Sequence, residues 1–212
     1  MRKFGSNFEG VYQSARGGVG DFVRKHKVLL LCLLFISLVA VLTGVFTAIK
    51  NADNYSAVWF DNYNIKNFYD SDMGTWDLFF DRFGSYFACL IIVFLSSLNV
   101  FLTPFSVAVL VIRAYLVGLN CCFMFLLFGL SGMLTTIIII LPIQIINLVL
   151  LIAFCALMFI RARNKKKYGA YCVGGEKKPI VIFFIFLALF TLVNVVETLL
   201  LFVFSSKIIL VI

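Results

Sequence analysis

An uncharged apolar run of 22 residues, Val28–Ile49, is the feature that most constrains how this chain folds. A helix needs about 20 apolar residues to cross the hydrocarbon core of a bilayer. More long apolar runs follow, and in all 63% of the 212 residues are hydrophobic and 13% are charged. Soluble domains have about 45–50% apolar and about 25% charged residues. The sequence therefore predicts an all-α membrane protein, a polytopic bundle whose apolar surface is covered by lipid.

Five membrane-spanning helices are expected. The first span is longer than the 7–15 apolar residues of a signal peptide, so it is interpreted as an uncleaved anchor. Thr103-Pro104 is expected to end the second span in a tight hairpin, and Pro142 to tilt or kink the fourth. The predicted order is a basic N-terminal segment (1–27), TM1 (28–49), an acidic aromatic loop (50–85), TM2 (86–102), TM3 (105–128), TM4 (133–160), a basic loop (161–179), TM5 (180–204) and a tail (205–212).

The positive charges lie beside the apolar runs. Of the 18 Lys and Arg residues, six lie in Met1–Lys27 and seven in Arg161–Lys178. Flanks of this kind stay on the cytoplasmic side of a membrane, whereas the loop at 50–85, with six Asp and three Lys or Arg, is expected outside. The N-terminus is then cytoplasmic and the C-terminus outside. No nucleic-acid partner is expected, because the basic segments contain no recognisable reading module.

Aromatic residues in the acidic loop are spaced as on one face of a helix. They are Trp76, Phe79, Phe80, Phe83 and Phe87. This spacing predicts an amphipathic interfacial helix that leads into the second span. Its rings would form an aromatic belt at the membrane surface, which is the favoured interpretation. The alternative is a docking surface for an exported partner, formed by Trp76, Phe79, Phe80 and Phe83; one helix could serve both purposes.

Polar residues inside the predicted spans are candidates for function, because each needs a partner in lipid. The main ones are Arg113, Asn120, Gln144, Asn147, Asn194 and Glu197. An ion pair between Arg113 and Glu197 is disfavoured, since the two lie about 12 Å and about 26 Å from the inner ends of their helices. Ala114 and Gly118, four residues apart, predict a close helix contact.

No catalytic centre, cofactor site or metal site is expected. The chain contains no phosphate-binding glycine loop, metalloprotease helix motif or nucleophile elbow. Its single histidine, His26, lies among basic residues before the first span, and its six cysteines show neither metal-ligand spacing nor a disulfide framework. The sequence therefore predicts that the protein is not an enzyme.

Short motifs in Asn99–Asn147 carry a resemblance to a known family. They are the Thr103-Pro104 hairpin, Arg113–Gly118, Leu130–Leu134 and Leu141–Gln144. With these motifs, its length and the placement of its spans, the chain resembles the stage II sporulation protein M family. The family motif and packing positions are Pro104, Ala114, Gly118, Gly132, Pro142 and Gln144. Family members often place an amide directly after the proline, whereas here Ile143 precedes Gln144.

The resemblance implies a scaffold without enzymatic activity in the mother-cell membrane of an endospore-forming bacterium. It implies recruitment of two peptidoglycan-degrading partners, stage II sporulation proteins D and P, to the septum during engulfment. Self-association into a homo-oligomer stays open. The rival interpretation is a transporter or permease subunit with a path near Pro142, Gln144 and Asn147, because broken helices often line substrate paths.

Overall fold

The structure, a computed structural model, describes residues 20, 22–51, 75–168 and 179–208, and every element in these ranges is a helix. Nearly all of the basic N-terminal segment, most of the acidic loop, part of the second basic loop and the end of the tail lie outside the described residues. The elements are α2 (Lys27–Lys50), α5 (Thr75–Ser96), the 3₁₀-helix η2 (Val100–Leu102), α6 (Thr103–Thr135), the π-helix η3 (Thr136–Ile140), α7 (Leu141–Tyr168) and α8 (Pro179–Ile208).

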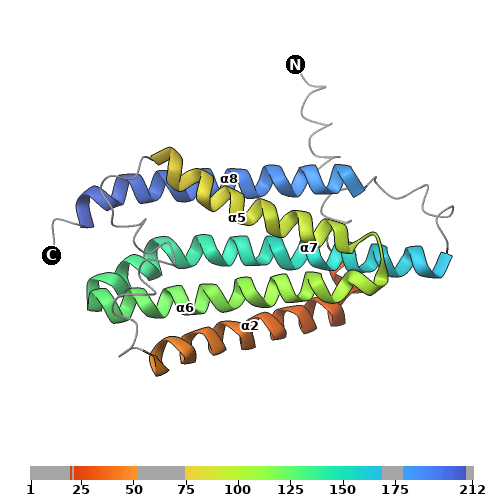
Figure 1. The fold of residues 1–212 in the computed structure, drawn as a ribbon, viewed down its shortest axis with the longest axis horizontal. Coiled ribbons are helices and arrows are strands. Elements are labelled where there is room, and N and C mark those ends of the chain that lie inside the picture. The colour runs from red at the N-terminus through yellow and green to blue at the C-terminus, as the bar shows by residue number, and fades with distance from the viewer. Residues whose placement is uncertain (1–19, 21, 52–74, 169–178, 209–212) are drawn as a thin grey trace, which may run out of the picture.

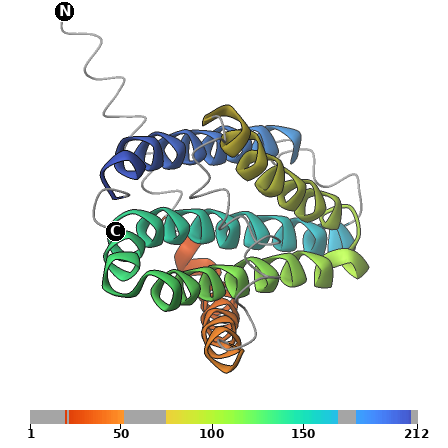
Figure 2. The same ribbon diagram turned by 60° about the vertical axis from the view of Figure 1, so that its left-hand side comes forward.

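The helices run along one long axis, with α5 crossing α8 obliquely (Figure 1). A second view shows α5 with α8 in one layer, α6 with α7 in the next, and α2 alone on the far side (Figure 2). The starts of α2 and α6 and the end of α7 lie at one end of the bundle, which we call the basic end (Figure 1). The end of α2, the start of α5 and the end of α6 lie at the other, which we call the loop end.

Among the described residues, four segments are long and apolar enough to cross a membrane: Lys27–Lys50, Val100–Leu126, Leu141–Arg163 and Pro179–Leu200. The shortest has 22 residues and is about 33 Å long, which matches a hydrocarbon core of about 30 Å. Pro179 begins α8, a position where the missing backbone donor costs nothing. The prediction of an all-α chain with several helices that could span a membrane is confirmed.

The expected second span differs in its bounds. α5 begins at Thr75 and ends at Ser96, so the predicted interfacial helix and the predicted span at 86–102 form one continuous helix. Its apolar part, Phe83–Ser96, has fewer than 18 residues and a length of about 21 Å. This is shorter than the hydrocarbon core. A complete crossing by α5 stays a prediction.

Polar side chains end α5 before the predicted residue 102. Ser96 and Ser97 donate their hydroxyls to backbone carbonyls one turn earlier, at 2.6 and 2.7 Å. Asn99 caps η2, its Oδ1 accepting a backbone N–H at 3.2 Å. α6 then begins at Thr103, with Pro104 in its first turn. Side chains of the hairpin thus form hydrogen bonds with backbone groups at the helix ends. A segment that lies in the membrane requires this, because no water is there to bind those groups.

Two backbone irregularities separate α6 from α7 at the loop end. Gly129 has φ 57° and ψ −134°, a conformation that glycine adopts more readily than other residues. The chain then forms the π-helix η3 before α7 begins at Leu141. Pro142 cannot donate to the preceding turn, so the irregularity predicted at Pro142 falls just before it, at Thr136–Ile140. The predicted spans left residues 129–132 between TM3 and TM4, and in the structure the backbone leaves helical geometry at Gly129.

Two glycines bring α2 and α6 into backbone contact. A Cβ added at Gly44 would lie 2.9 Å from a backbone nitrogen of α6, and one at Gly118 would lie 2.8 Å from the carbonyl carbon of Val41. Neither position has room for a side chain. Ala40 and Ala48, one turn to either side of Gly44, are also buried. The crossing is of the small-residue type that lets membrane helices approach closely.

The main apolar core lies among α5, α6, α7 and α8, around Leu90, Phe154 and Phe190. Apolar side chains on the outward faces stay exposed, among them Phe46 on α2 and Leu192 on α8. Because the exposed faces of the candidate spans are apolar, they suit contact with lipid.

Candidate functional site

Five polar side chains from three helices meet inside the bundle. We call them the polar cluster: Tyr86 on α5, Gln144 and Asn147 on α7, and Asn194 and Glu197 on α8. None of the five is more than 9% exposed. Four of them were expected to be intramembrane polar residues, and a hydrogen bond joins two of these, Gln144 and Glu197. Within a bilayer each polar group must be satisfied by protein or by a bound ligand, so the cluster is the leading candidate site.

Gln144 joins the three helices through both ends of its amide. The Tyr86 hydroxyl donates to Oε1 of Gln144 at 2.9 Å, and Nε2 of Gln144 donates to Oε1 of Glu197 at 3.1 Å. The ring of Tyr86 stacks on Phe190, with 5.5 Å between ring centroids. These contacts fix the orientation of the Glu197 carboxylate relative to α5 and α7.

The register of α7 on α8 follows from two contacts. Gln144 meets Glu197 toward the loop end, and the ring centroids of Phe154 and Phe186 lie 5.0 Å apart toward the basic end. Both contacts fit antiparallel helices in nearly the same register. The two asparagines of the polar cluster therefore lie opposite each other, one turn further into the bundle than the Gln144–Glu197 contact.

Asn147 and Asn194 are the most deeply buried members of the cluster, at 1% and 0% exposure. Neither the oxygen nor the nitrogen of either side-chain amide has a hydrogen-bond partner in the structure. A buried amide without partners costs about 1–3 kcal/mol in protein mutational data. The cluster therefore contains two opposed amides whose hydrogen-bonding capacity the chain leaves unused.

Arg113 on α6 approaches the cluster through Tyr86. Its guanidinium carbon lies 4.5 Å from the centroid of the Tyr86 ring, a cation–π contact. Its Nε donates to Sγ of Cys89 at 3.0 Å, and its Nη2 donates to the hydroxyl of Ser85. A chain of contacts through Tyr86 and Gln144 connects Arg113 with Glu197.

The other predicted positions are more scattered. Asn120 is half-buried, and its Oδ1 has no hydrogen-bond partner. Gly118 lies against Val41 of α2, and Ala114, one turn earlier, is fully buried. The remaining family-motif positions lie along the chain as follows: Pro104 in the first turn of α6, Gly132 in its last, and Pro142 in the first turn of α7.

The aromatic residues at the start of α5 form a ladder, which we call the aromatic stripe: Trp76, Phe79, Phe80, Phe83 and Phe87. The rings of Phe79, Phe83 and Phe87 stack in succession, with centroids 5.7 and 5.8 Å apart. Trp76 and Phe80 are 73% and 62% exposed. The stripe thus holds large rings in place while leaving two of them uncovered.

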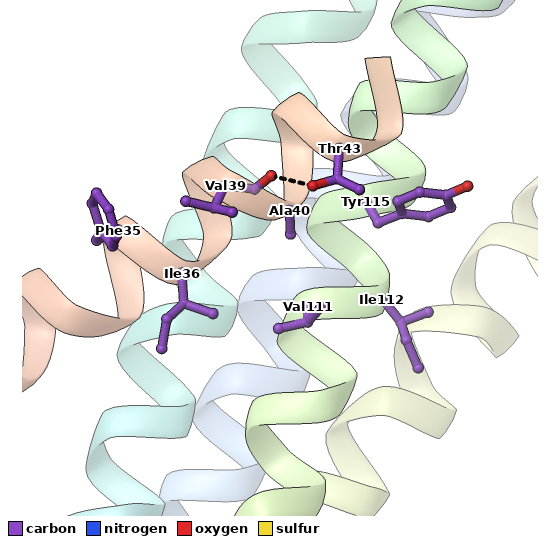
Figure 3. Close-up of a pocket in the computed structure, with 8 residues that line it drawn as sticks. All are labelled: Phe35, Ile36, Val39, Ala40, Thr43, Val111, Ile112 and Tyr115. Atoms are coloured by element: carbon purple, nitrogen blue, oxygen red, sulfur yellow. Dashed lines mark hydrogen bonds between the residues drawn. The ribbon is translucent and has the colours of Figure 1, made fainter. Parts of the chain in front are cut away.

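An open apolar groove of about 420 Å³ runs between α2 and α6. It is lined by Phe35, Ile36, Val39, Ala40, Thr43, Val111, Ile112 and Tyr115 (Figure 3). The Thr43 hydroxyl donates to the Val39 carbonyl at 2.8 Å, and the Tyr115 ring extends away from α2 (Figure 3). The groove offers hydrocarbon contact and no polar group arranged for chemistry.

The side chains of the polar cluster can bind a ligand through hydrogen bonds or through charge. It supplies one carboxylate, three amides and one phenol, with no nucleophile placed beside a base. Among the described residues, no group of three or more His, Cys, Asp or Glu side chains could hold a metal ion.

Sequence reasoning missed three α5 residues that join the site: Ser85, Tyr86 and Cys89. Tyr86 lies beside Phe87 in the aromatic stretch that leads into the second span, so its apolar ring attracts more notice than its hydroxyl. The hydroxyl of Tyr86 could have marked it as a site residue, because a tyrosine buried in a membrane helix needs a hydrogen-bond partner for that group. Ser85 and Cys89 are four residues apart on one helical face, which is the spacing that lets both reach Arg113.

Comparison with known proteins yields no assignment. No protein family, no curated protein and no solved structure matches this chain. The likeness to the stage II sporulation protein M family therefore rests on its sequence motifs alone.

Proposed function

We propose that the protein is a non-enzymatic membrane scaffold that recruits or anchors peptidoglycan-degrading partners at the septum during engulfment. The observation that carries this proposal is the aromatic stripe. Its exposed rings, Trp76 and Phe80, belong to the same rigid helix that packs into the bundle through Tyr86 and Leu90. Exposed aromatic side chains on a fixed backbone are typical anchors of protein interfaces, because they bury much area at little entropic cost.

In this proposal the basic end lies in the cytoplasm. The sequence clusters Lys and Arg around the start of α2 and around the end of α7, and both of these helix ends lie at that end of the bundle (Figure 1). Positively charged flanks are retained on the cytoplasmic side. The stripe then lies on the outer face of the membrane, where wall-degrading enzymes act. The C-terminus lies on the same outer side.

The proposed occupant of the stripe is an apolar, membrane-proximal segment of an exported wall-degrading enzyme, such as stage II sporulation protein D or P. A membrane-proximal segment is favoured because the stripe continues directly into the apolar part of α5 at Phe83. A partner bound there contacts rings and lipid headgroups together. The hydrolytic chemistry belongs to that partner.

Crosslinking in cells tests the proposal. A photoreactive amino acid replaces Phe80 in one strain and Leu95 in a control strain. Both side chains are exposed and lie on α5, but Leu95 lies near the opposite end of that helix. We expect the Phe80 probe to capture a wall-degrading enzyme during engulfment and the Leu95 probe to capture lipid. Capture of lipid alone from every position of the aromatic stripe would contradict the docking role. The stripe would then be an aromatic belt at the membrane surface.

A transporter or permease subunit is the second candidate, and the polar cluster favours it. Gln144 and Asn147 follow the π-helix and Pro142, an irregular backbone beside buried polar groups that resembles a transporter binding site. Expression confined to the sporulation stage would favour the scaffold, whereas a neighbouring gene for a nucleotide-binding ATPase would favour the permease. Solute uptake that depends on Gln144 in reconstituted vesicles would replace the scaffold proposal.

A further inference from the structure

The apolar groove between α2 and α6 has the size and the lining of a site for a hydrocarbon chain. Its volume of about 420 Å³ lies within the range of about 300–1,000 Å³ that is usual for ligand pockets. Apart from Thr43 and Tyr115, every residue that lines it is apolar. The Thr43 hydroxyl already donates to the Val39 carbonyl, and the Tyr115 ring extends away from α2 (Figure 3). The groove therefore suits an apolar ligand better than a polar one.

The groove lies at the depth of lipid acyl chains. Phe35 is eight residues after the start of α2, and Val111 is eight residues after the start of α6, which is about 12 Å along each helix axis. Thr43, at the far end of the groove, is about 24 Å from the start of α2. One leaflet contributes about half of a hydrocarbon core of about 30 Å. An acyl chain that enters from the basic end therefore reaches the groove.

An exposed apolar track connects the groove with the basic end. It consists of Val28, Cys32, Phe35 and Val39, which are spaced by four, three and four residues and so share one face of α2. All four are exposed, and a cysteine in such a position behaves as a small apolar residue. Phe35 and Val39 also line the groove. A hydrocarbon chain can thus follow this face of α2 from the start of the helix into the groove.

Positive charges lie where the track begins. Arg24, Lys25 and Lys27 are exposed, and Lys25 lies three residues before Val28. The helical ladder of backbone hydrogen bonds continues across His26 into α2, so these residues lead directly into the track. Each Lys or Arg near a membrane surface strengthens the attraction of anionic lipid about fivefold. The charge at the start of the track therefore complements an anionic headgroup.

We propose that this face of the bundle binds one anionic phospholipid from the leaflet at the basic end. Its headgroup contacts Arg24, Lys25 and Lys27, and one of its acyl chains follows the track into the groove. A helix of a second copy fits the groove less well, because small residues that admit a close helix, Gly44 and Ala48, are already buried within the bundle. The site is independent of the scaffold proposal, since it uses none of the residues of the aromatic stripe.

The test is native mass spectrometry of the purified full-length protein from micelles that contain phosphatidylglycerol and phosphatidylcholine in equal amounts. We expect about one phosphatidylglycerol per chain, retained at least tenfold more often than phosphatidylcholine. Val39→Trp fills the groove and should lower this retention at least fivefold. Leu38→Trp is the matched control, because Leu38 is similarly exposed on α2 but does not line the groove. Its retention should stay within twofold of the parent protein.

A second variant tests the headgroup contact. The triple variant Arg24→Gln, Lys25→Gln, Lys27→Gln removes the three charges and should lower the preference for phosphatidylglycerol over phosphatidylcholine at least tenfold. Lys50→Gln is its matched control, because Lys50 lies in the last turn of the same helix, at the loop end. Its preference should stay within twofold of the parent. Size-exclusion and circular-dichroism profiles verify that each variant is folded before lipid binding is measured.

Four results would overturn the site. The first is equal retention of the two lipids by the parent protein, which would assign the bound lipid to the apolar surface in general. The second is retention by folded Val39→Trp that equals that of Leu38→Trp. The third is an unchanged lipid preference in the folded triple variant. The fourth is a lipid-free dimer that dissociates in Val39→Trp, which would assign the groove to a second copy of the chain.

Discussion

Adding one methyl group at Gly118 should push α2 away from α6. A Cβ there would lie 2.8 Å from the carbonyl carbon of Val41 and 3.0 Å from its Cα. Both neighbours are backbone atoms, so the contact cannot be relieved by turning a side chain. Gly118→Ala therefore forces α2 to move or the helices to bend.

The expected cost combines two opposed terms. Overpacking a tight contact costs about 1–3 kcal/mol. Replacing glycine by alanine inside a helix stabilises the folded state by about 0.5–1 kcal/mol. The two ranges subtract to a net loss of about 0–2.5 kcal/mol, and the midpoint of about 1.2 kcal/mol lowers the folded-to-unfolded ratio roughly 8-fold. Gly44→Ala should cost a similar amount, because a Cβ there would lie 2.9 Å from the backbone nitrogen of Leu119.

Equilibrium unfolding in mixed micelles of mild detergent and dodecyl sulfate measures this difference. Gly84→Ala in α5 is the matched control, because no atom lies within 4 Å of a Cβ added at Gly84. That variant should be stabilised by about 0.5–1 kcal/mol. The double variant Gly44→Ala, Gly118→Ala should lose less than the sum of the single losses, since one displacement of α2 relieves both clashes. If Gly118→Ala behaved like Gly84→Ala, the close crossing would be refuted.

Three further outcomes are expected. Tyr86→Phe keeps the ring but leaves Oε1 of Gln144 without its donor, which should cost about 1–3 kcal/mol in the same unfolding assay; no loss would argue against the hydrogen-bond chain. Gly129→Ala places a side chain at φ 57° and should cost about 1–2 kcal/mol. In intact cells, a cysteine introduced within residues 61–72 should react with an impermeant thiol reagent, and one near Lys166 should not; the reverse pattern would invert the proposed topology.

Much of the helical architecture follows directly from the sequence. The uncharged run at Val28–Ile49 and the apolar run that Pro179 opens leave few alternatives to membrane helices, and the structure has α2 and α8 there. Gly118 could be assigned to a close helix contact because small residues recur at membrane helix interfaces. Its partner, Gly44, could not be assigned, because the sequence of α2 does not indicate which helix packs against that glycine.

Element boundaries and contacts between distant residues were harder to predict. Apolar residues continue from Ser96 to Leu102, so hydrophobicity alone extends the second span, whereas the hydrogen bonds of Ser96, Ser97 and Asn99 end it earlier. Helical spacing puts Gln144 and Asn147 on one face of α7, and Asn194 and Glu197 on one face of α8. Spacing does not predict that Gln144 and Glu197 touch, because that contact depends on the antiparallel register of the two helices.

The backbone contact between α2 and α6 also bears on how the chain assembles during synthesis. α2 enters the membrane long before its partner, since Gly44 and Gly118 are 74 residues apart. It must persist in lipid without α6 during that interval, and α2 has the highest mean hydropathy of the four candidate spans. α6 has the lowest and carries Arg113, so it arrives as the segment least suited to lipid alone. The earlier-made helix of this pair thus provides a surface on which the less hydrophobic one packs.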